Sequence, residues 1–372
     1  MKYVGLRCVN PMKVDIADKS ICADWNGFIT SSDHHFFHYF EWSSIFEEAY
    51  GFRPLYIIVR DDSDKIIAGY PLFYTKSFLF GSSLKSMPYH IEGGAVFRPD
   101  VANKIPIYEM IISKLLALQS ELKIRNVDIK FADKADKRVF TAIPEDQIRI
   151  YKTYYRYIVN ISIGEDKLFE SFRQDVRNSV RRAKKFGVRA EVKDSPDSIN
   201  LFYKIYILWS KGIGLPGHSE LFFRLIWDVF APKGMAKIVF AYINNEPVAA
   251  KLFLLDPSNR YVLQNWGTIT DFRLKKYQVN TALHWEEIKW CIANKYKTFD
   301  FGVTSEFNKG AQYFKKGWAT KEELINFCNI GDFSNTKKRD DHNAGGLFRL
   351  FWKKMPLSVI KNLGPLILKQ GN

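Results

Sequence analysis

The chain has 372 residues, of which 47% are hydrophobic and 26% are charged, proportions typical of a soluble globular protein. This length exceeds that of one ordinary hydrophobic core, so we expect two domains. The formal net charge of +15 favours a polyanionic partner: nucleic acid, a phosphorylated sugar precursor or an anionic membrane face. Composition alone selects none of the three.

Cysteine spacing and the N-terminus exclude several classes of protein. No Cys-x-x-Cys pair occurs, which argues against a zinc site and against a disulfide framework. The segment MKYVGLRCVNP lacks the apolar core of a signal peptide, and no run approaches the roughly 20 apolar residues of a membrane-spanning helix. We therefore expect a cytoplasmic protein with free thiols. The cysteines are Cys8, Cys22, Cys291 and Cys328.

Three histidines near residue 35 form the first chemically suggestive stretch, in DHHFFH. His34 and His38 would share one face of a helix, but no carboxylate or fourth ligand follows at a spacing suited to a metal ion. We therefore predict no metal site here. We expect instead the start of a helix, capped by Ser32 or Asp33.

The segment PLYIIVRDDSDKIIAGYPLFY, Pro54 to Tyr74, predicts a β-hairpin, because two apolar strands flank a polar turn. The segment YEMIISKLLALQSELKIR then predicts a helix, and NVDIKF predicts a strand. This order of hairpin, helix and strand is a common element of α/β proteins.

A basic helix is predicted by LFESFRQDVRNSVRRAKKFGV, Leu168 to Val188, with Gly187 as its C-cap. Arg177 and Arg181 form a cationic ridge beside its apolar stripe, an arrangement suited to binding the phosphate groups of an acceptor. The alternative is a solvated basic face. The apolar stripe consists of Leu168, Phe172, Val176, Val180 and Ala183.

The order found in the first half then recurs. KIVFAYINNEPVAAKLFLL, Lys237 to Leu255, predicts a hairpin with its turn at Asn244-Asn245. NTALHWEEIKWCIANKYK predicts a helix, and TFDFGV predicts a strand. The repetition predicts two similar α/β domains, residues 1–160 and 161–335, followed by a basic amphipathic tail, residues 336–372.

The segment DFRLKKYQVN precedes the second of these helices, where we expect Asn280 to be the N-cap. Unpaired N–H groups at this helix start, with Lys275 and Lys276 close by, predict an anion site. An ordinary capped helix is the alternative. Within the helix we expect His284 to be a packed core residue rather than a base. The chain contains no Ser-His-Asp signature, P-loop or dinucleotide fingerprint.

The predicted strand continues into FDFGVTSEFNKGAQYFKKGW, which we interpret as a loop that combines aromatic and cationic side chains. With RRAKKFGV and VNTALHWEEIKWC, this stretch resembles the FemAB (FemABX) family of peptidoglycan-bridge transferases. FFHYFEW, YGFRPLYIIV, GYPLFY and SMPYHIEGG extend the resemblance into the first half, so it covers about residues 30–320. It implies an α/β fold of two tandem GNAT-like acyltransferase domains, with mixed sheets flanked by helices and the donor site in the second domain.

The resemblance also implies a reaction and its residues. Family members transfer an aminoacyl group from aminoacyl-tRNA to an amine of a cell-wall precursor, without a bound cofactor. The Phe-Lys pair of the family corresponds to Phe314 and Lys315, so Lys315 would neutralise the charge that develops on the acyl carbonyl or the leaving 3′ oxygen. Phe314 and its neighbour Tyr313 would contact the donor, since an aromatic ring stacked on a base contributes about 1–3 kcal/mol. The alternative makes Phe314 a core residue and Lys315 a solvated one.

No histidine suits the role of general base. We expect an acceptor carboxylate or Asp300 to take the proton of the attacking amine, with a purely structural role as the alternative for Asp300. The acceptor would be a phosphorylated or lipid-linked glycan precursor of peptidoglycan or exopolysaccharide.

Two features differ from relatives of this kind. The long helical hairpin of some bridge-forming members is missing, consistent with a smaller contact with tRNA. GNAT enzymes that use acyl-CoA hold its pyrophosphate with a Gly-rich turn, whereas DFRLKKYQVN contains no glycine, so Lys275 and Lys276 would have to bind the phosphates. One alternative function is therefore an acetyl-CoA-dependent N-acetyltransferase acting on an amino sugar. Another is a non-catalytic adaptor that binds a polyanion.

The tail LFRLFWKKMPLSVIKNLGPLILKQ is apolar, aromatic and basic, and Pro356 and Pro365 interrupt it. It resembles the tails of FemAB-like proteins encoded with exopolysaccharide and surface-protein sorting systems. Such a segment can lie at the anionic inner face of a membrane, near a lipid-linked acceptor, each Lys or Arg adding about 1 kcal/mol. Docking on the protein's own core is the alternative, and the sequence leaves both open.

Overall fold

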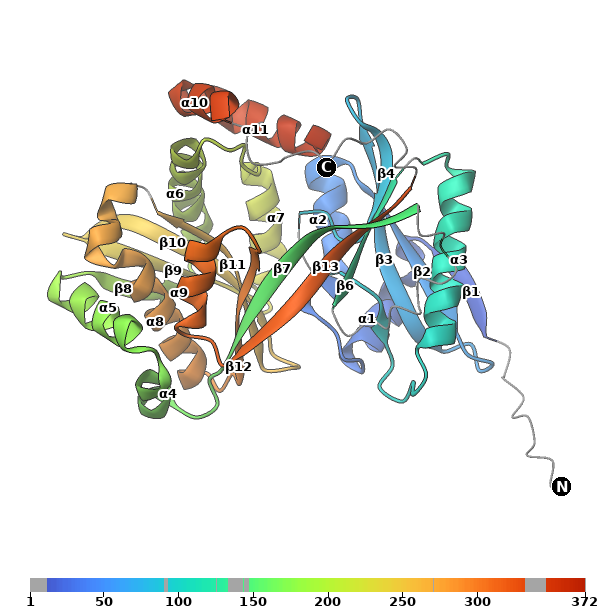
Figure 1. Cartoon of the computed structure of the whole chain (residues 1–372), viewed down its shortest axis with the longest axis horizontal. Helices are drawn as coiled ribbons and strands as arrows, with labels where there is room; N and C mark the ends of the chain where they lie inside the picture. Colours follow the sequence, from blue (N-terminus) through green and yellow to red (C-terminus); the bar gives the residue numbers. More distant parts are fainter. Residues whose placement is uncertain are drawn as a thin grey trace.

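The computed structural model describes residues 12–89, 93–124, 126–132, 143, 147–269, 271–331 and 346–371. Over these residues, 13 strands form one sheet that runs through the molecule, with helices on both of its faces (Figure 1). None of the helices in this described part is both long and apolar enough to span a bilayer.

The elements fall into two halves and a set that joins them. The first half contains β1 (Lys13–Ala17), η1 (Lys19–Ile21), α1 (Cys22–Thr30), η2 (Phe36–His38), α2 (Glu41–Tyr50), β2 (Arg53–Arg60), β3 (Ile66–Ser77), β4 (Gly81–Lys85), β5 (Val96–Phe97), α3 (Ile105–Glu121) and β6 (Asn126–Ala132). The second half contains α4 (Glu165–Ser171), α5 (Gln174–Lys185), β8 (Arg189–Lys193), α6 (Ser198–Ile213), α7 (Glu220–Phe230), β9 (Ala236–Ile243), β10 (Glu246–Asp256), β11 (Tyr261–Ile269), η5 (Phe272–Tyr277), α8 (Val279–Ala293), β12 (Thr298–Ser305) and α9 (Lys309–Lys316). The remaining elements are β7 (Ile148–Asn160), β13 (Lys321–Gly331), α10 (Gly346–Lys354) and α11 (Leu357–Gly371).

The order of strands across the sheet reads as a near-palindrome: β1-β2-β3-β4-β6-β13-β7-β12-β11-β10-β9-β8, with β5 beside β3. The hairpin β2–β3 corresponds to β9–β10, and the parallel pair β4 and β6 corresponds to the parallel pair β11 and β12. In each half a long helix, α3 or α8, connects the two parallel strands. The predicted repeat of hairpin, helix and strand is therefore confirmed. At the turn of the second hairpin, Asn244 and Asn245 have φ values of 52° and 65°, as a tight two-residue turn requires.

Two strands are exchanged between the halves. β7 pairs with β12 of the second half, β13 pairs with β6 of the first half, and the two pair with each other. This exchange makes the sheet continuous and ties the halves together through main-chain hydrogen bonds. We retain residues 1–160 and 161–335 as a proposed division of the chain. The proposed start of the tail, residue 336, lies outside the described residues.

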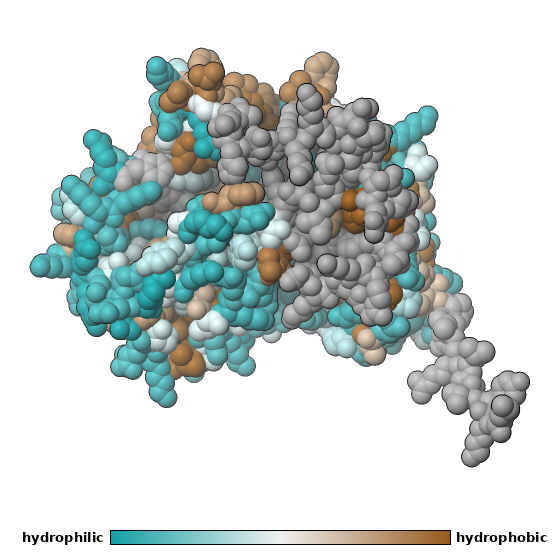
Figure 2. Space-filling model, viewed as in Figure 1, coloured by the Kyte–Doolittle hydropathy of each residue, from teal (hydrophilic) through white to brown (hydrophobic). Residues whose placement is uncertain are grey.

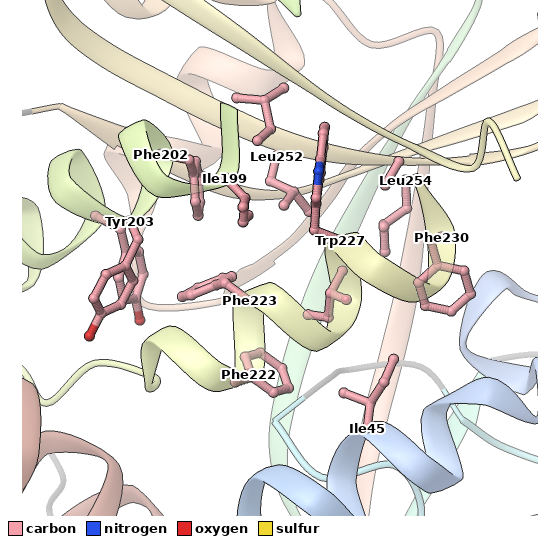
Figure 3. Close-up of a cluster of buried hydrophobic side chains, with 14 of the residues drawn as sticks. Ile45, Ile199, Phe202, Tyr203, Phe222, Phe223, Trp227, Phe230, Leu252 and Leu254 are labelled. Atoms are coloured by element: carbon pink, nitrogen blue, oxygen red, sulfur yellow. The ribbon is translucent and has the colours of Figure 1, made fainter. Parts of the chain in front are cut away.

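A large aromatic cluster packs the helices α6 and α7 against one face of the second half of the sheet (Figure 3). The turn η2 and helix α2 of the first half join this cluster: the ring centroids of Phe36 and Phe230 lie 4.9 Å apart, and those of Phe46 and Phe222 lie 5.9 Å apart. Ile45 of α2 points towards α7 in Figure 3. The halves therefore share one hydrophobic core on this face, in addition to the exchanged strands.

The predicted basic helix is two helices rather than one. Phe172 adopts an extended conformation (φ −68°, ψ 150°) and ends α4, and α5 starts at Gln174. The break arises because Phe172 is buried against Trp285 and Trp318, and Arg173 N donates to Gly317 O at 3.1 Å. The predicted C-cap is off by one residue: Phe186 is the C-cap of α5, and Gly187 follows it in a left-handed conformation with a φ of 70°.

Two further local expectations were wrong. The histidine-rich stretch forms the short 3₁₀ turn η2, capped by the His35 N–H donating to His38 Nδ1 at 2.9 Å, in place of a helix capped by Ser32 or Asp33. The segment expected to be a loop forms helix α9, because Asn308 caps it by accepting from Ala311 N at 3.1 Å.

The tail helices pack on the core. Trp352 of α10 and Ile360 of α11 are fully buried in the aromatic cluster, and both helices contact α6. Docking of the tail on the protein is thus confirmed, although its outward face is exposed, as described below.

Candidate active site

A cavity of about 670 Å³ opens between β11 and β12 and reaches the start of α8. These strands pair in parallel where Tyr261–Leu263 meets Thr298–Asp300. Gly267 and Phe301, further along the same strands, line the cavity. Helix α9 and Trp209 of α6 contribute to its walls. The cavity therefore sits where two parallel neighbours continue beyond their paired segment.

Four of the predicted site residues meet in this cavity: Lys315, Phe314, Lys275 and Asn280. They come from α9, from η5 and from the first turn of α8, elements that are separated along the chain but adjacent in space. The structure thus brings together the predicted anion site and the predicted Phe-Lys pair.

The start of α8 differs from the expectation. Gln278, with a left-handed conformation (φ 60°), is the N-cap, so Asn280 lies inside the first turn. The side chain of Gln278 makes no capping hydrogen bond to the α8 N-terminus. First-turn N–H groups without a side-chain cap can receive an anion, and Lys275 adds positive charge beside them. Lys276 instead lies over the Tyr277 ring, with its ammonium 5.0 Å from the ring centroid.

Lys315 is held by an irregularity in strand β12. The register of β12 against β7 shifts between Asp300 and Val303, where Gly302 has a φ of 66°. The Lys315 ammonium donates to Gly302 O at 3.2 Å and to Val303 O at 3.1 Å. Burial lowers the pKa of Lys315 to about 8, and the nearby Asp300 carboxylate opposes that shift. The ammonium is therefore fixed at the cavity wall and titrates near neutral pH.

Asp300 supports this irregular segment from behind. It accepts a hydrogen bond from Gly302 N at 2.7 Å, and an ion pair of 2.6 Å joins it to Arg156 Nε. Tyr261 also donates to its carboxylate. Asp300 is fully buried and does not belong to the cavity lining formed by described residues. Its geometry suits a residue that positions Lys315 through Gly302, whereas a general base must reach the attacking amine.

The two aromatic neighbours on α9 point to different places. Phe314 lines the cavity, with its ring centroid 5.3 Å from that of His284. Tyr313 is 61% exposed, stacks under the Arg173 guanidinium at 3.8 Å and donates to Asp175 at 3.2 Å. Phe314 therefore faces the cavity, while Tyr313 lies on the outer surface of α9.

Three buried polar side chains lie at the cavity, between β10 and α8. Lys251 of β10 is 1% exposed, and His284 and Glu287 lie on the facing side of α8. Within the described residues, Lys251 Nζ, His284 Nδ1 and both Glu287 oxygens have no hydrogen-bond partner. Lys251 and His284 line the cavity itself. Unpaired polar groups at such depth are costly, which is why they are frequent at functional sites.

Burial controls the charge of these three groups. It lowers the pKa of Lys251 far below its usual value, although Glu287 opposes the shift. It raises the pKa of Glu287 to about 8 against the attraction of Lys251. The pKa of His284 also falls well below its usual value, through burial and the positive charges of Lys251 and Lys315. Burial therefore disfavours the charged forms of all three side chains.

The sequence analysis did not identify Lys251 or Glu287, and it expected His284 to be a core residue. A signal for Lys251 existed: it is the one cation inside the apolar run VAAKLFLL. Glu287 lies three residues after His284, on the same face of the helix.

The predicted acceptor-binding arginines lie away from the cavity. Arg177 donates to Glu170 O at 2.8 Å and to Phe172 O at 2.6 Å, so it caps the end of α4. Arg181 is exposed, with its guanidinium 5.5 Å from the centroid of the Phe169 ring. The structure places both on the outer face of the second half.

A second cavity, of about 840 Å³, lies between the halves, where η2 faces β7, β11 and β13. His34 and Asp256 form a buried ion pair of 3.0 Å at its wall. Although burial opposes it, hydrogen bonds from His34, Ser258 and Tyr39 lower the pKa of Asp256 to about 2. In the described part of the chain, no group of three or more potential ligands is arranged for a metal ion.

Comparison with known proteins agrees with this architecture. Residues 170–316 match the acetyltransferase (GNAT) domain family, and no curated protein matches the chain. The crystal structure of FemX is 14% identical, with a TM-score of 0.62, covering 82% of this chain and 95% of that one. L-PGS from Bacillus licheniformis is 14% identical (TM-score 0.51; 79% and 91% covered), and a tandem GNAT protein from the clavulanic acid biosynthesis pathway is 8% identical (TM-score 0.56; 86% and 98% covered). The predicted tandem GNAT fold and the predicted resemblance are confirmed.

Proposed function

Because the second half carries a GNAT acetyltransferase domain within a tandem GNAT fold, we propose that this protein is an N-acyltransferase. It transfers an aminoacyl or acyl group from an activated ester or thioester to an amine of a cell-envelope precursor, of peptidoglycan or of a polysaccharide. The donor is a co-substrate, aminoacyl-tRNA or acyl-CoA, and no cofactor stays bound.

The observation that carries this proposal is the position of Lys315. Its ammonium is fixed by two main-chain carbonyls at the wall of the cavity, between Phe314 and the start of α8. A preorganised cation in a site shielded from water stabilises developing negative charge without reorganising. Acyl transfer creates such charge on the carbonyl oxygen and then on the leaving group.

The reaction is a direct displacement without a protein nucleophile. The acceptor nitrogen attacks the acyl carbon, so a C–N bond forms while the C–O or C–S bond to the donor breaks. Lys315 stabilises the carbonyl oxyanion and then the departing oxygen or sulfur. The amine loses one proton during this step, and the leaving group gains one.

We assign the proton transfer to Lys251, in place of Asp300. Lys251 lines the cavity, is buried and has no hydrogen-bond partner among the described residues. Because burial lowers the pKa of its amine, Lys251 can exchange a proton more readily than an exposed lysine, so that it accepts the proton of the attacking amine and returns it to the leaving group. Lys315 is held by main-chain carbonyls, and burial raises the pKa of Glu287 to about 8, so we place the proton transfer on the unpaired Lys251 amine.

The donor would enter along the start of α8. A ribose phosphate or pyrophosphate near Lys275 and Asn280 would meet the N-terminal N–H groups of the helix. The same geometry supports the second candidate function, an acetyl-CoA-dependent N-acetyltransferase acting on an amino sugar, since both donors present phosphate and adenine next to the acyl group. The acceptor would approach from the opposite side, where Trp209 lines the cavity.

One assay tests the proposal and separates its candidates. An amine-bearing cell-wall precursor is incubated with the protein and either charged tRNA or acetyl-CoA, and the products are analysed by mass spectrometry. A mass increase of one aminoacyl group with charged tRNA supports the FemAB-like function, and one acetyl group with acetyl-CoA supports the second candidate. If neither mixture yields product while the protein retains a polyanion, the proposal is wrong and the protein is an adaptor.

A further inference from the structure

Large apolar side chains are exposed at the tip of the β3–β4 hairpin. Phe78 is 95% exposed, Leu79 is 65% exposed and Phe80 is 60% exposed. These three consecutive side chains at a turn therefore present most of their apolar surface to solvent. Contiguous exposed apolar surface of this size marks a site of interaction with a protein or a membrane.

The outward face of the tail helices is similarly apolar. While Trp352 and Ile360 are buried in the core, α10 and α11 leave other large side chains exposed, among which Phe348 stacks on Trp352 at the edge of the buried side. These are Leu347, Phe348, Leu350, Phe351, Val359, Leu363 and Leu366. The helices are therefore apolar on two sides, and only one side is covered by the described part of the chain.

The hairpin tip and the tail are joined. Ser77 Oγ donates to Gln370 O at 2.8 Å, and Phe78 N donates to the side chain of Gln370 at 2.6 Å. Figure 1 shows the hairpin tip and the tail helices at the same edge of the molecule, and Figure 2 shows brown side chains at that edge. Ser77 and Gln370 are 293 residues apart in the chain, yet the two segments that contain them form one surface.

This surface carries one sign of charge. Arg349, Lys353, Lys354 and Lys361 are exposed on the tail helices. The sequences GLFRLFWKK and LSVIKNLGPLILKQG contain no acidic residue. Cations beside aromatic and aliphatic groups match the boundary between anionic headgroups and acyl chains. A second copy of the same surface would bring like charges together, which opposes self-association.

We propose that the β3–β4 tip and the outward face of α10 and α11 together form a membrane-docking surface for anionic bilayers. The tip inserts its three apolar side chains between headgroups, and the tail helices lie along the plane of the membrane. The hairpin tip thus adds a second membrane contact beside that of the tail. Two joined contacts fix the orientation of the protein on the bilayer, which one helix alone would not.

This orientation bears on the acceptor, and that part rests on the proposed transferase function. Gly214 at the end of α6 packs under α10 so closely that an added Cβ would lie 2.9 Å from Arg349 Cβ. Trp209 lies five residues earlier on α6, roughly 8 Å along the helix axis, and lines the active-site cavity. The helix that lines the acceptor side of the cavity therefore also supports α10, so docking would bring this side of the cavity close to a lipid-linked acceptor.

The test uses flotation of the full-length protein with vesicles of phosphatidylcholine alone or mixed with phosphatidylglycerol, without donor or acceptor. The wild type should bind the anionic vesicles and be released by high salt, because exposed charges are screened. A variant with Phe78→Ser, Leu79→Ser and Phe80→Ser should bind at least about tenfold more weakly. Lys353→Glu with Lys354→Glu should have an effect of about tenfold to a hundredfold.

Two control variants match these changes. Ile163→Ser removes an apolar side chain that is 42% exposed in the second half, and Lys184→Glu with Lys185→Glu reverses two exposed charges on α5. Both should leave vesicle binding within about twofold. Substitution is preferred to truncation, because removal of Trp352 would open the core. Circular dichroism and the melting temperature verify the fold of each variant.

Unchanged vesicle binding by the folded hairpin variant would overturn the proposal. A second result would also overturn it: the wild type does not bind vesicles, but it forms concentration-dependent dimers, detected by light scattering, that the same substitutions abolish. Because binding is measured without substrates, a failure here leaves the transferase proposal intact, and the absence of transfer leaves the docking surface intact.

Discussion

The two halves of the sheet share one plan but fill the space between helix and strands differently. In the first half, α3 covers β2 and β3 with a cluster whose buried members are aliphatic and aromatic side chains and one cysteine. In the second half, α8 covers β9 and β10, and Lys251, His284 and Glu287 are buried at equivalent depth. Among the described residues, no buried lysine or glutamate lies between α3 and the first half of the sheet, so this topology does not by itself require such groups.

The buried polar groups of the second half lower its stability, which is expected if they serve a chemical function. Removing an unpaired amine and a carboxyl from water costs several kcal/mol, so apolar residues at these positions would make the second half more stable. The first half acts as an internal reference, because the same topology there supports an apolar interface. Substitutions in the two halves can test whether the buried polar groups of the second half serve acyl transfer.

The largest effect is expected for Lys251→Met. Loss of the proposed base should lower turnover by about 10²–10⁴-fold, the usual contribution of general acid–base catalysis. The same change should raise the free energy of unfolding by about 1–4 kcal/mol, because a buried ionisable group is replaced by an apolar one of similar length. The substitution does not leave an unpaired buried charge on Glu287, because burial raises the pKa of this residue to about 8 and its carboxyl group is largely neutral near pH 7. Single-turnover kinetics and urea unfolding measure both quantities.

The reverse change in the first half is the matched control. Leu72→Lys places an ammonium against α3, where no function requires one. It should lower the free energy of unfolding by at least about 3 kcal/mol, through lost apolar burial and an unpaired charge. If Lys251→Met loses stability while Leu72→Lys is tolerated, the two halves do not differ in the way proposed.

The next effect concerns Lys315→Ala. Removal of one preorganised contact to a developing charge should raise the barrier by about 2.7–4 kcal/mol, a loss of about 10²–10³-fold in turnover. Lys85→Ala in β4 of the first half removes a lysine from an ion pair with Asp128 and should change turnover less than about twofold. Equal turnover of wild type and the folded Lys315→Ala variant would remove this lysine from the mechanism.

The dependence of turnover on pH follows from the charge that Lys315 must carry. Lys315 acts as a cation, and burial lowers its pKa to about 8, so turnover should fall as the pH rises through about 8. Lys315→Arg keeps its charge well above that pH, because guanidinium stays protonated beyond about pH 12. The alkaline decline should therefore disappear or move upwards in this variant, although turnover at pH 7 is lower through altered geometry. A decline that stays at the same pH would assign it to another group.

The smallest effect is expected at the outer face of α5. If Arg177 and Arg181 bind a phosphate of the acceptor, replacing both with Ala should raise the apparent KM for the acceptor more than it lowers kcat. Arg177 donates hydrogen bonds to two main-chain carbonyls, so the double substitution should also lower the stability of the protein. Arg181→Ala alone avoids that loss and isolates the acceptor contact. An unchanged KM in the Arg181→Ala variant would make this ridge a solvated face.

Local sequence patterns predicted much of the fold. The two hairpins, the helices α3 and α8 and the strands β6 and β12 lie where apolar periodicity placed them. Propensity failed where a tertiary contact or a cap decided the outcome. Phe172 breaks the basic helix to reach Trp285 and Trp318, and Asn308 turns an expected loop into α9.

The candidate site was predictable in part. Resemblance to a family singled out Phe314 and Lys315, and a helix start beside two lysines singled out Lys275 and Asn280. All four line one cavity. Asp300 was proposed as a base because no histidine suited that role, but its carboxylate pairs with Arg156 of β7, Tyr261 of β11 and the Gly302 N–H of its own strand.

The sequence by itself determined the repeated order of elements, the positive charge and the amphipathic tail, because these depend on residue type and on spacing along the chain. Only the tertiary structure decided that β7 and β13 exchange between the halves, that Lys251 faces His284 and Glu287, and that the β3–β4 tip meets α11. Each of these pairs segments far apart in the chain. Periodicity shows which side of an element is buried, but burial against a particular partner, and the pKa shift that follows, depends on how the whole chain packs.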